Sequence, residues 1–347
     1  MNQPSSDFTL PPTIESEEAL EELLSRPAPE LSAELGGLDG DIMILGAGGK
    51  IGPSLARMAK RACPEKKVYA VARFSNGSLA DELAGDGIEI IKADLLDRTA
   101  IEALPKVANV MFLAGQKFGS SDAQSRTWVM NSFMPGLVAE HFKESRIVAY
   151  STGCVYPFVP IISGGASEDL PPDPPGEYAM SCIGRERIFE YFSKNYGTPG
   201  RLFRLNYAID MRYGVLVDIA RKVLAGETID VTMGHVNVIW QGDANVMALR
   251  SLAHTTSVTS PINVSGPETI SVRWAAKAFA RRFGKAARIE GQEADYAWLT
   301  NTAQANKLFG YPKVSLELLM DWVADWIARG REIYDKPTKF EVRDGNY

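Results

Sequence analysis

A glycine-rich turn between an apolar run and a helical segment constrains this chain more than any other feature. The run "DIMIL" leads into "GAGGKIG", and "PSLARMAKRA" follows with helical spacing. Glycines at such a turn let a phosphate approach the N–H groups of the helix N-terminus, where the helix dipole favours an anion. The turn predicts a dinucleotide site; the alternative is a tight turn that only allows close helix–strand packing. The expected pyrophosphate contacts are Gly46, Gly49, Lys50, Ile51 and Gly52.

The segments that follow alternate between buried-strand and helical patterns. Strands are predicted within 67–73, 88–96, 109–115 and 146–152, with helical stretches between most of them, including 126–143. Strands that are apolar on both faces and alternate with helices are typical of a parallel sheet covered on both sides. We expect an α/β fold with a Rossmann-type doubly wound parallel sheet and a smaller C-terminal substrate-binding region. Ligands should bind outside the carboxyl ends of the strands.

We expect the chain to divide into three parts. An N-terminal arm with an acidic helix occupies 1–39, and a dinucleotide-binding Rossmann domain occupies 40–205. A mainly substrate-binding region, 206–347, returns in part to the Rossmann domain. The segment "ESEEALEELLSR" predicts a short helix, which we interpret as a solvated helix on the surface, with a role in dimerisation as the alternative. Its candidate docking residues are Ile14, Leu20, Leu23 and Leu24.

Two later segments, 271–284 and 315–330, have strong helical spacing, and the Gly- and Pro-rich segment 162–177 predicts a loop. Four apolar residues of the last helix recur on one helical face, which favours core packing over any contact with a ligand. These four are Leu319, Trp322, Val323 and Trp326.

Composition bounds the class of protein. The 347 residues have a formal charge of −6 and are 45% hydrophobic, as is ordinary for a soluble globular protein. No basic field is present, so we expect a small-molecule substrate and neither a nucleic-acid nor a membrane partner. Cys63, Cys154 and Cys182 are too few and too scattered for a disulfide framework or a zinc site, which favours a cytoplasmic protein without a metal. Neither a signal peptide nor an apolar run of about 18 residues is present.

The end of the second predicted strand bears on the choice of cofactor. An acidic residue there binds the ribose diol of NAD, but 66–80 contains no carboxylate, and Arg73 stands in that place. A planar guanidinium suits a 2′-phosphate, so NADP is favoured over NAD. The margin is small, because an arginine also stacks on the adenine of either cofactor.

Eight motifs follow one another along the chain: "GAGGKIG", "ADLLD", "LAGQKFG", "NSFMPGL", "STGCVYP", "YAMSC", "WQGDANVMAL" and "INVSGPETISV". In this order they resemble the extended short-chain dehydrogenase/reductase family, in its NAD-dependent epimerase/dehydratase branch, over roughly residues 40–330. The likeness is specific for the family and almost silent about the substrate.

The resemblance implies further cofactor contacts. Asp94 would face the adenine, Gly115 and Lys117 would lie in the loop after the fourth strand, and Asn131 would be the buried asparagine of a helix. The implied set outside the glycine turn and Arg73 is Asp94, Leu95, Leu113, Ala114, Gly115, Lys117, Asn131, Ser151 and Tyr178.

The same resemblance implies the catalytic residues and shows one departure. The family's Tyr-x-x-x-Lys motif falls on "YAMSC", so Tyr178 would be the general acid/base and Cys182 stands where the lysine belongs. Thr152 would orient the reacting oxygen. A free tyrosine titrates near 10, and lowering its pKa by about three units takes about 4 kcal/mol of electrostatic help. Cys182 cannot be a cation, and we interpret it as a non-catalytic replacement.

Two other residues are candidates for the missing positive charge, Lys117 and Arg185. Arg185 lies on a similar helical face to Tyr178, but we favour a surface arginine paired with a nearby glutamate. Cys154 and Cys182 offer a redox pair or a thiol nucleophile, although inert buried thiols are commoner. Candidate substrate contacts are Thr152, Cys154, Asn206, Tyr207 and His235, the last weighed against a structural histidine.

These residues favour an NAD(P)-dependent oxidoreductase or epimerase/dehydratase that acts on a hydroxylated sugar-like or sugar-acid substrate, with NADP or NAD as cofactor. The alternative is a non-catalytic NAD(P)-binding sensor or regulatory protein, which would account directly for the loss of the lysine. A homodimer is the assembly that analogy with the resembled family favours.

Overall fold

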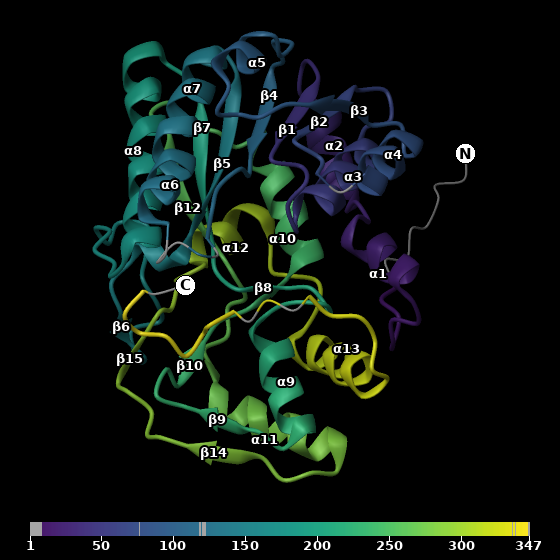
Figure 1. Cartoon of the computed structure of the whole chain (residues 1–347), viewed down its shortest axis with the longest axis vertical. Helices are drawn as coiled ribbons and strands as arrows, with labels where there is room; N and C mark the ends of the chain where they lie inside the picture. The colour runs from purple at the N-terminus through teal and green to yellow at the C-terminus, as the bar shows by residue number, and fades with distance from the viewer. Residues whose placement is uncertain are drawn as a thin grey trace.

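The structure is a computed structural model of the chain and describes residues 9–75, 77–117, 119, 123–334, 336 and 338–345. A parallel sheet with helices on both faces forms the upper part in Figure 1, and a second group of helices and short strands lies below it. No helix of the described ranges combines the length and the apolar character needed to cross a membrane.

The central sheet has seven strands in the order β12-β7-β5-β4-β1-β2-β3, and every neighbouring pair is parallel. The chain starts at β1, moves to one edge through β2 and β3, and then crosses over to β4, so the strand order reverses beside β1. The expected doubly wound sheet is confirmed. Its strands are β1 (Ile42–Leu45), β2 (Val68–Ala72), β3 (Glu89–Lys92), β4 (Asn109–Phe112), β5 (Arg146–Thr152), β7 (Gly200–Leu205) and β12 (Ser260–Val264).

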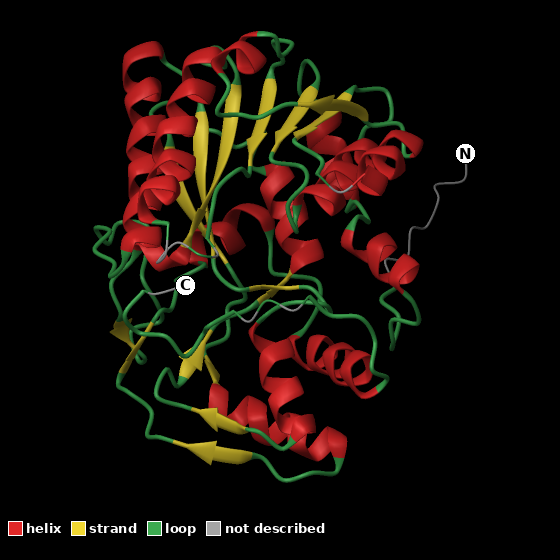
Figure 2. Cartoon of the chain, viewed as in Figure 1, coloured by secondary structure: helices red, strands yellow, loops and turns green. Residues whose placement is uncertain are grey.

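Alternate side chains of β1 point to opposite faces of the sheet and enter two different cores. Ile42 and Ile44 pack with one group of helices, and Met43 and Leu45 pack with another. Figure 2 shows helices on both faces of the sheet. The first group is α2 (Pro29–Gly36), α3 (Gly52–Ala62), α4 (Gly77–Gly85), α10 (Gln241–Arg250) and α12 (Ala303–Phe309). The second is α5 (Arg98–Glu102), α7 (Met134–His141) and α8 (Glu177–Tyr196), and α6 (Gln124–Trp128) leads through the π-helical turn η1 (Val129–Phe133) into α7.

A third core lies in the lower part of the molecule. It is built by α9 (Val215–Ala225), α11 (Val272–Phe283) and α13 (Leu316–Ala328). Leu319, Trp322, Val323 and Trp326 of α13 are all buried in it, as their spacing predicts. Short strand pairs link the parts: β6 (Val159–Pro160) with β15 (Tyr296–Ala297), β8 (Ala208–Ile209) with β11 (Ile239–Trp240), β9 (Thr228–Asp230) with β14 (Arg288–Glu290), and β10 (His235–Val236) with β13 (Ile270–Ser271).

The N-terminal helix α1 (Glu17–Leu24) is a structural element of the fold. Its Leu20 and Leu24 are completely buried and belong to the third core, together with Ile14 and Leu23. The interpretation as a solvated surface helix is therefore wrong, because its apolar stripe finds partners on segments far along the chain. Helix α2, which follows it, was not predicted.

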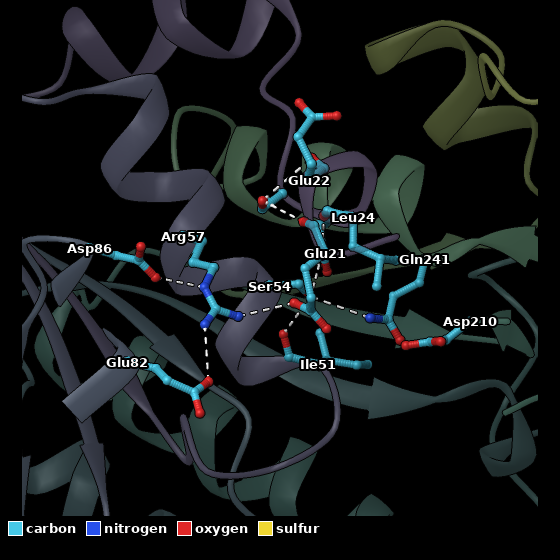
Figure 3. Close-up of polar contacts among 12 residues, drawn as sticks. Glu21, Glu22, Leu24, Ile51, Ser54, Arg57, Glu82, Asp86, Asp210 and Gln241 are labelled. Carbon is cyan, nitrogen blue, oxygen red and sulfur yellow. Dashed lines mark hydrogen bonds and ion pairs between the residues drawn. The ribbon is translucent and has the colours of Figure 1, made fainter. Parts of the chain in front are cut away.

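Glu21 of α1 connects the sheet region to the third core. One oxygen accepts from Arg57 Nη1 of α3 at 3.0 Å and the other from Arg212 Nη2 at 2.7 Å. Figure 3 shows Arg57 among Glu21, Glu82 and Asp86. Glu21 therefore connects α1 both to α3 and to the segment that follows β8.

Candidate active site

The glycine turn lies at the carboxyl end of β1 and leads directly into α3. Gly46 has a φ of +93°, and a Cβ there would lie 2.6 Å from the backbone nitrogen of Ala114. At Gly52 a Cβ would lie 2.5 Å from the carbonyl oxygen of Ala47. Only glycine fits these positions, so the turn lies tightly against the loop after β4 and against its own backbone at Ala47.

An outer cavity of about 270 Å³ extends from this turn along the carboxyl ends of β2 and β3. Arg73 and Asp94 are exposed side chains of its lining. The predicted contacts that line it are Gly46, Gly49, Arg73, Asp94, Leu95, Leu113, Ala114 and Gly115. The remaining members are Gly48, Ala72, Phe74, Ser75, Leu79, Ala93, Met130 and Met134.

An inner cavity, also about 270 Å³, adjoins the outer one, because Leu113 and Gly115 line both. It lies between the carboxyl ends of β5 and β7 and the segment around β8. The predicted residues that line it are Lys50, Ile51, Leu113, Gly115, Lys117, Ser151, Thr152, Cys154, Tyr178, Asn206 and Tyr207. Asn206 and Tyr207, both candidate substrate contacts, therefore lie at the same cavity.

Thr152 and Tyr178 reach the inner cavity from the ends of two regular elements. Thr152 is the last residue of β5, and its Oγ1 caps the next turn by accepting from the Cys154 N–H at 3.1 Å. Tyr178 is the second residue of α8, just after Gly176 with its φ of +84°. Both hydroxyls belong to rigid elements, which fixes their separation.

Cys182 lies one turn after Tyr178 on α8 and is completely buried. Burial raises the pKa of its thiol to about 11, so the group is neutral near pH 7. The Tyr178 hydroxyl hydrogen-bonds this sulfur, and burial followed by Cys182 and Cys154 raises the pKa of Tyr178 well above its ordinary value. Cys182 thus does nothing to make the tyrosine a better base.

Arg185 supplies a buried positive charge on the same helix. Its side chain is 6% exposed, and it donates from Nη1 to the Tyr150 carbonyl at 2.7 Å and from Nη2 to Asn131 Oδ1 at 2.8 Å. It lines the inner cavity and acts to lower the pKa of Tyr178. The expectation of a surface arginine paired with a glutamate is wrong, because the neighbouring Glu186 binds Arg204 instead.

Two lysines also line the inner cavity. Lys117 Nζ lies 5.9 Å from the centroid of the Tyr178 ring, and burial lowers the pKa of this lysine. Lys50 Nζ lies 3.1 Å from the centroid of the Tyr213 ring. Burial, followed by the positive charge of Lys117, lowers the pKa of Lys50 to about 7. The cavity is therefore rich in positive charge next to the tyrosine.

Another hollow, larger than these two, lies elsewhere. It measures about 650 Å³ and is lined by Val107, Ala108 and Ser145, which lie at the amino ends of β4 and β5. In open parallel sheets ligands bind at the opposite, carboxyl ends. We therefore place the candidate active site at the two smaller cavities.

The family model described as "NAD dependent epimerase/dehydratase family" matches residues 42–244, more than half of the chain. The chain belongs to this family. It is a family of enzymes of the extended short-chain dehydrogenase/reductase type. No match was found among the curated proteins.

Solved epimerases and dehydratases share the fold. UDP-glucose 4-epimerase from Thermotoga maritima, solved with UDP-glucose, is 18% identical with a TM-score of 0.67, over 84% of this chain and 99% of that one. UDP-glucuronic acid 4-epimerase from Bacillus cereus, solved with UDP-glucuronic acid and NAD, is 19% identical with a TM-score of 0.66, over 83% and 99%. The dTDP-glucose 4,6-dehydratase from Streptomyces venezuelae, with NAD bound, is 17% identical with a TM-score of 0.70, over 83% and 97%.

Several of the predicted cofactor contacts and motif residues do not line either cavity or do not point their polar groups into it. Asn131 is buried behind the loop, where it bonds Gln116, Ser181 and Arg185 and lines neither cavity. Gly52 and Cys182 are likewise outside both linings. Ser151 lines the inner cavity, but its hydroxyl donates to Glu186 at 2.6 Å.

His235, predicted as a substrate contact and weighed against a structural histidine, does not line the inner cavity. It lies on β10, which pairs with β13 in the lower part of the molecule. The pairing of β10 with β13 joins segments far apart in the sequence, which spacing along the chain could not show.

Several residues that line the inner cavity were not predicted from the sequence. They come from segments that the motifs do not cover, or from positions that the fold alone brings near. Thr338, for example, belongs to the C-terminal segment and binds Asp218. The unpredicted members are Gln116, Tyr150, Leu205, Ala208, Tyr213, Gly214, Gln241 and Thr338.

Proposed function

We propose that the chain is an NAD(P)-dependent oxidoreductase or epimerase/dehydratase acting on a hydroxylated sugar-like or sugar-acid substrate, with Tyr178 as the acid/base. The observation that supports this most is the joint lining of one cavity by Tyr178 and Thr152, next to the glycine turn. A member that only bound a dinucleotide would have no need to keep both hydroxyls on an open cavity. The substrate class is supported by the nucleotide-sugar names of the solved relatives.

The residues present fit a dinucleotide. Gly46, Gly48 and Gly49 of the glycine turn line the outer cavity, and the inner cavity adjoins it, so the two together offer an elongated space beside the turn. The outer cavity would hold the adenosine half, with Asp94 at the adenine side and Arg73 at a 2′-phosphate, which favours NADP. The inner cavity would hold the nicotinamide half. Bound there, the cofactor would supply hydride acceptance and donation.

Tyr178 moves the proton in this proposal, and Thr152 orients the reacting oxygen. Because burial raises the pKa of Tyr178, its hydroxyl keeps its proton near pH 7 and is suited to act as an acid. Accepting a proton requires a lower pKa, and each unit corresponds to about 1.4 kcal/mol of charge interaction. Arg185, Lys117 and Lys50 are the cations placed to provide it, in place of the lysine that Cys182 replaces.

We also propose that residues after 205 provide most of the substrate contacts. Asn206, Tyr207 and Tyr213 line the inner cavity opposite β5 and α8. Amide and hydroxyl groups of this kind hydrogen-bond substrate hydroxyls.

The test is turnover. Purified protein should oxidise or reduce the cofactor, read at its absorbance band, with members of a panel of sugar acids and nucleotide sugars, and Tyr178→Phe should abolish this while cofactor binding persists. Cofactor binding without turnover on any member of the panel would support the sensor instead, and absence of cofactor binding would exclude both.

A further inference from the structure

Lys50 belongs to the glycine turn, yet its side chain leaves the turn. Gly46, Gly48 and Gly49 line the outer cavity, whereas Lys50 lines the inner one. Its Nζ lies against the face of Tyr213, a residue next to α9. An ammonium over an aromatic face is stabilised by the negative face of the ring. The charge is thus held at the junction of the two parts of the chain and away from the N-terminus of α3.

Positive charge is concentrated in this space. Lys50, Lys117 and Arg185 line the inner cavity, and no Asp or Glu occurs among the described residues of its lining. The other polar members of the lining are neutral groups able to bind hydroxyls, among them Thr152 and Asn206. A cavity of this composition favours a ligand that is both hydroxylated and anionic.

The two carboxylates that favour the charged form of Lys50 have other donors. Asp210 and Asp218 act electrostatically on Lys50, but Asp210 accepts two bonds from the Arg212 guanidinium at 3.0 and 2.8 Å. Asp218 accepts from the Thr338 N–H at 2.8 Å and from its hydroxyl at 2.6 Å. Neither carboxylate therefore neutralises the cavity fully.

The consequence is a lysine whose neutral amine is poised to take up a proton. Burial, Lys117 and Lys336 together lower the pKa of Lys50 to about 7, against the pull of Asp210 and Asp218. A bound anion would reverse this, since an opposite charge in contact favours the protonated amine. Anion binding above pH 7 should consequently be accompanied by proton uptake at Lys50.

We propose that Lys50, together with Lys117, binds the carboxylate of a hydroxy-acid substrate. The proposal rests on the proposed function, because it names the substrate class of that same site. A cavity of about 270 Å³ is at the small end for ligand sites and must also admit the nicotinamide half, which favours a compact acid over a nucleotide. Lys117 Nζ lies 5.9 Å from the Tyr178 ring centroid. A carboxylate bound by Lys117 would therefore lie close to Tyr178, and the carbinol that reacts there would be a few bonds away in the same substrate molecule.

The test compares acids with neutral partners of the same skeleton. Binding of D-gluconate against D-glucitol, and of D-glucuronate against D-glucose, is measured by calorimetry on the protein saturated with cofactor. At least one acid should bind more than about tenfold tighter than its partner. The variant Lys50→Met should lose this preference, Lys50→Arg should keep most of it, and Lys277→Met, at an exposed lysine of α11, should leave it unchanged.

Proton uptake provides a second readout. At pH 8 an amine of pKa about 7 is about nine-tenths neutral. Calorimetry in two buffers of different ionisation enthalpy should therefore show uptake approaching one proton per acid bound, and Lys50→Met should abolish it. The affinity for the acid should fall as the pH rises further, because the amine then holds its proton less readily.

Each contrary result overturns the proposal. Equal affinity for an acid and its neutral partner would contradict it, and so would an unchanged preference for the acid in Lys50→Met. Weakened cofactor binding in Lys50→Met would assign Lys50 to the pyrophosphate. Tighter binding of UDP than of either acid, lost in Lys50→Met, would assign the site to a phosphate instead. Failure of the proposed function is distinguishable, because turnover would then be absent from the whole panel or left intact in Tyr178→Phe, whatever the acid preference.

Discussion

The guanidinium of Arg185 donates to Asn131 Oδ1 at 2.8 Å directly behind Gly115, where a Cβ would collide with it. This pairing fixes a cation at the border of the inner cavity, two turns along α8 from Tyr178. The lysine of the family's motif is thus missing from its position, while positive charge is present in the same cavity from another residue.

Replacing Arg185 tests whether its positive charge takes the role of the lysine that is missing from the Tyr-x-x-x-Lys motif. Arg185→Met removes the buried charge and leaves the Tyr150 carbonyl without that donor, so we expect a loss of about 1–3 kcal/mol in the free energy of unfolding. The pH at which Tyr178 begins to act as a base should rise, and Arg185→Lys should restore part of it. Denaturant unfolding and a pH–rate profile measure the two effects. Arg187→Met is the control, because Arg187 lies exposed on the same helix and binds only Glu190 in the described structure; an equal effect in both would contradict the account.

Tyr178→Phe removes the hydroxyl proposed to transfer the proton. Turnover should fall by about 10²–10⁴-fold, and cofactor affinity should change little. Tyr191→Phe, at an exposed position of α8, should leave the rate unchanged. A variant that retains most of its activity would assign the acid/base role to another group.

Cys182→Ala separates a bystander from a reactive thiol. The buried thiol, with a pKa of about 11, is neutral at pH 7, so its removal should change the rate by less than about tenfold. Iodoacetamide at pH 7 should leave Cys182 unmodified, as mass spectrometry of the digested protein can show. Rapid labelling, or loss of activity in the alanine variant, would instead point to thiol chemistry.

Arg73→Ala tests the choice of cofactor. The guanidinium is exposed and lines the outer cavity, where it would meet a 2′-phosphate. We expect NADPH affinity to fall by about tenfold or more and NADH affinity to change little, measured by cofactor fluorescence. Equal losses for both cofactors would mean that Arg73 contacts a part that they share, such as the adenine.

Leu24→Ala tests the anchoring of α1. Deleting a completely buried side chain should lower the free energy of unfolding by about 2–5 kcal/mol. Glu18→Gln, at an exposed position of the same helix, should have little effect. A negligible change in Leu24→Ala would return α1 to the status of a surface attachment.

The sheet was predictable from sequence because its signals are local. The run from Ile42 to Leu45 is apolar at every position and ends in glycines, which is enough to specify a buried strand and its turn. The docking of α1 was not predictable, since the partner of Glu21 is Arg212, distant in sequence and adjacent only once the third core forms.

The candidate site also contains both residues that local motifs reveal and residues that only long-range contacts place. Thr152, Tyr178 and the glycine turn were found because each belongs to a motif at a fixed distance from a strand. Arg185 was misjudged because a helical arginine is normally exposed, and the acceptors that keep it buried, Asn131 and the Tyr150 carbonyl, come from other elements. His235 lies on a strand that pairs with β13, a long-range contact that spacing along the sequence does not reveal.

The most direct test of the central claim is a crystal structure of the protein with NADPH or NADH bound. The account predicts the adenosine half beside Arg73 and Asp94, and the nicotinamide in the inner cavity with its C4 within about 4 Å of the Tyr178 hydroxyl. A nicotinamide outside this cavity, or a Tyr178 hydroxyl turned away from it, would contradict the assignment of Tyr178 as the acid/base.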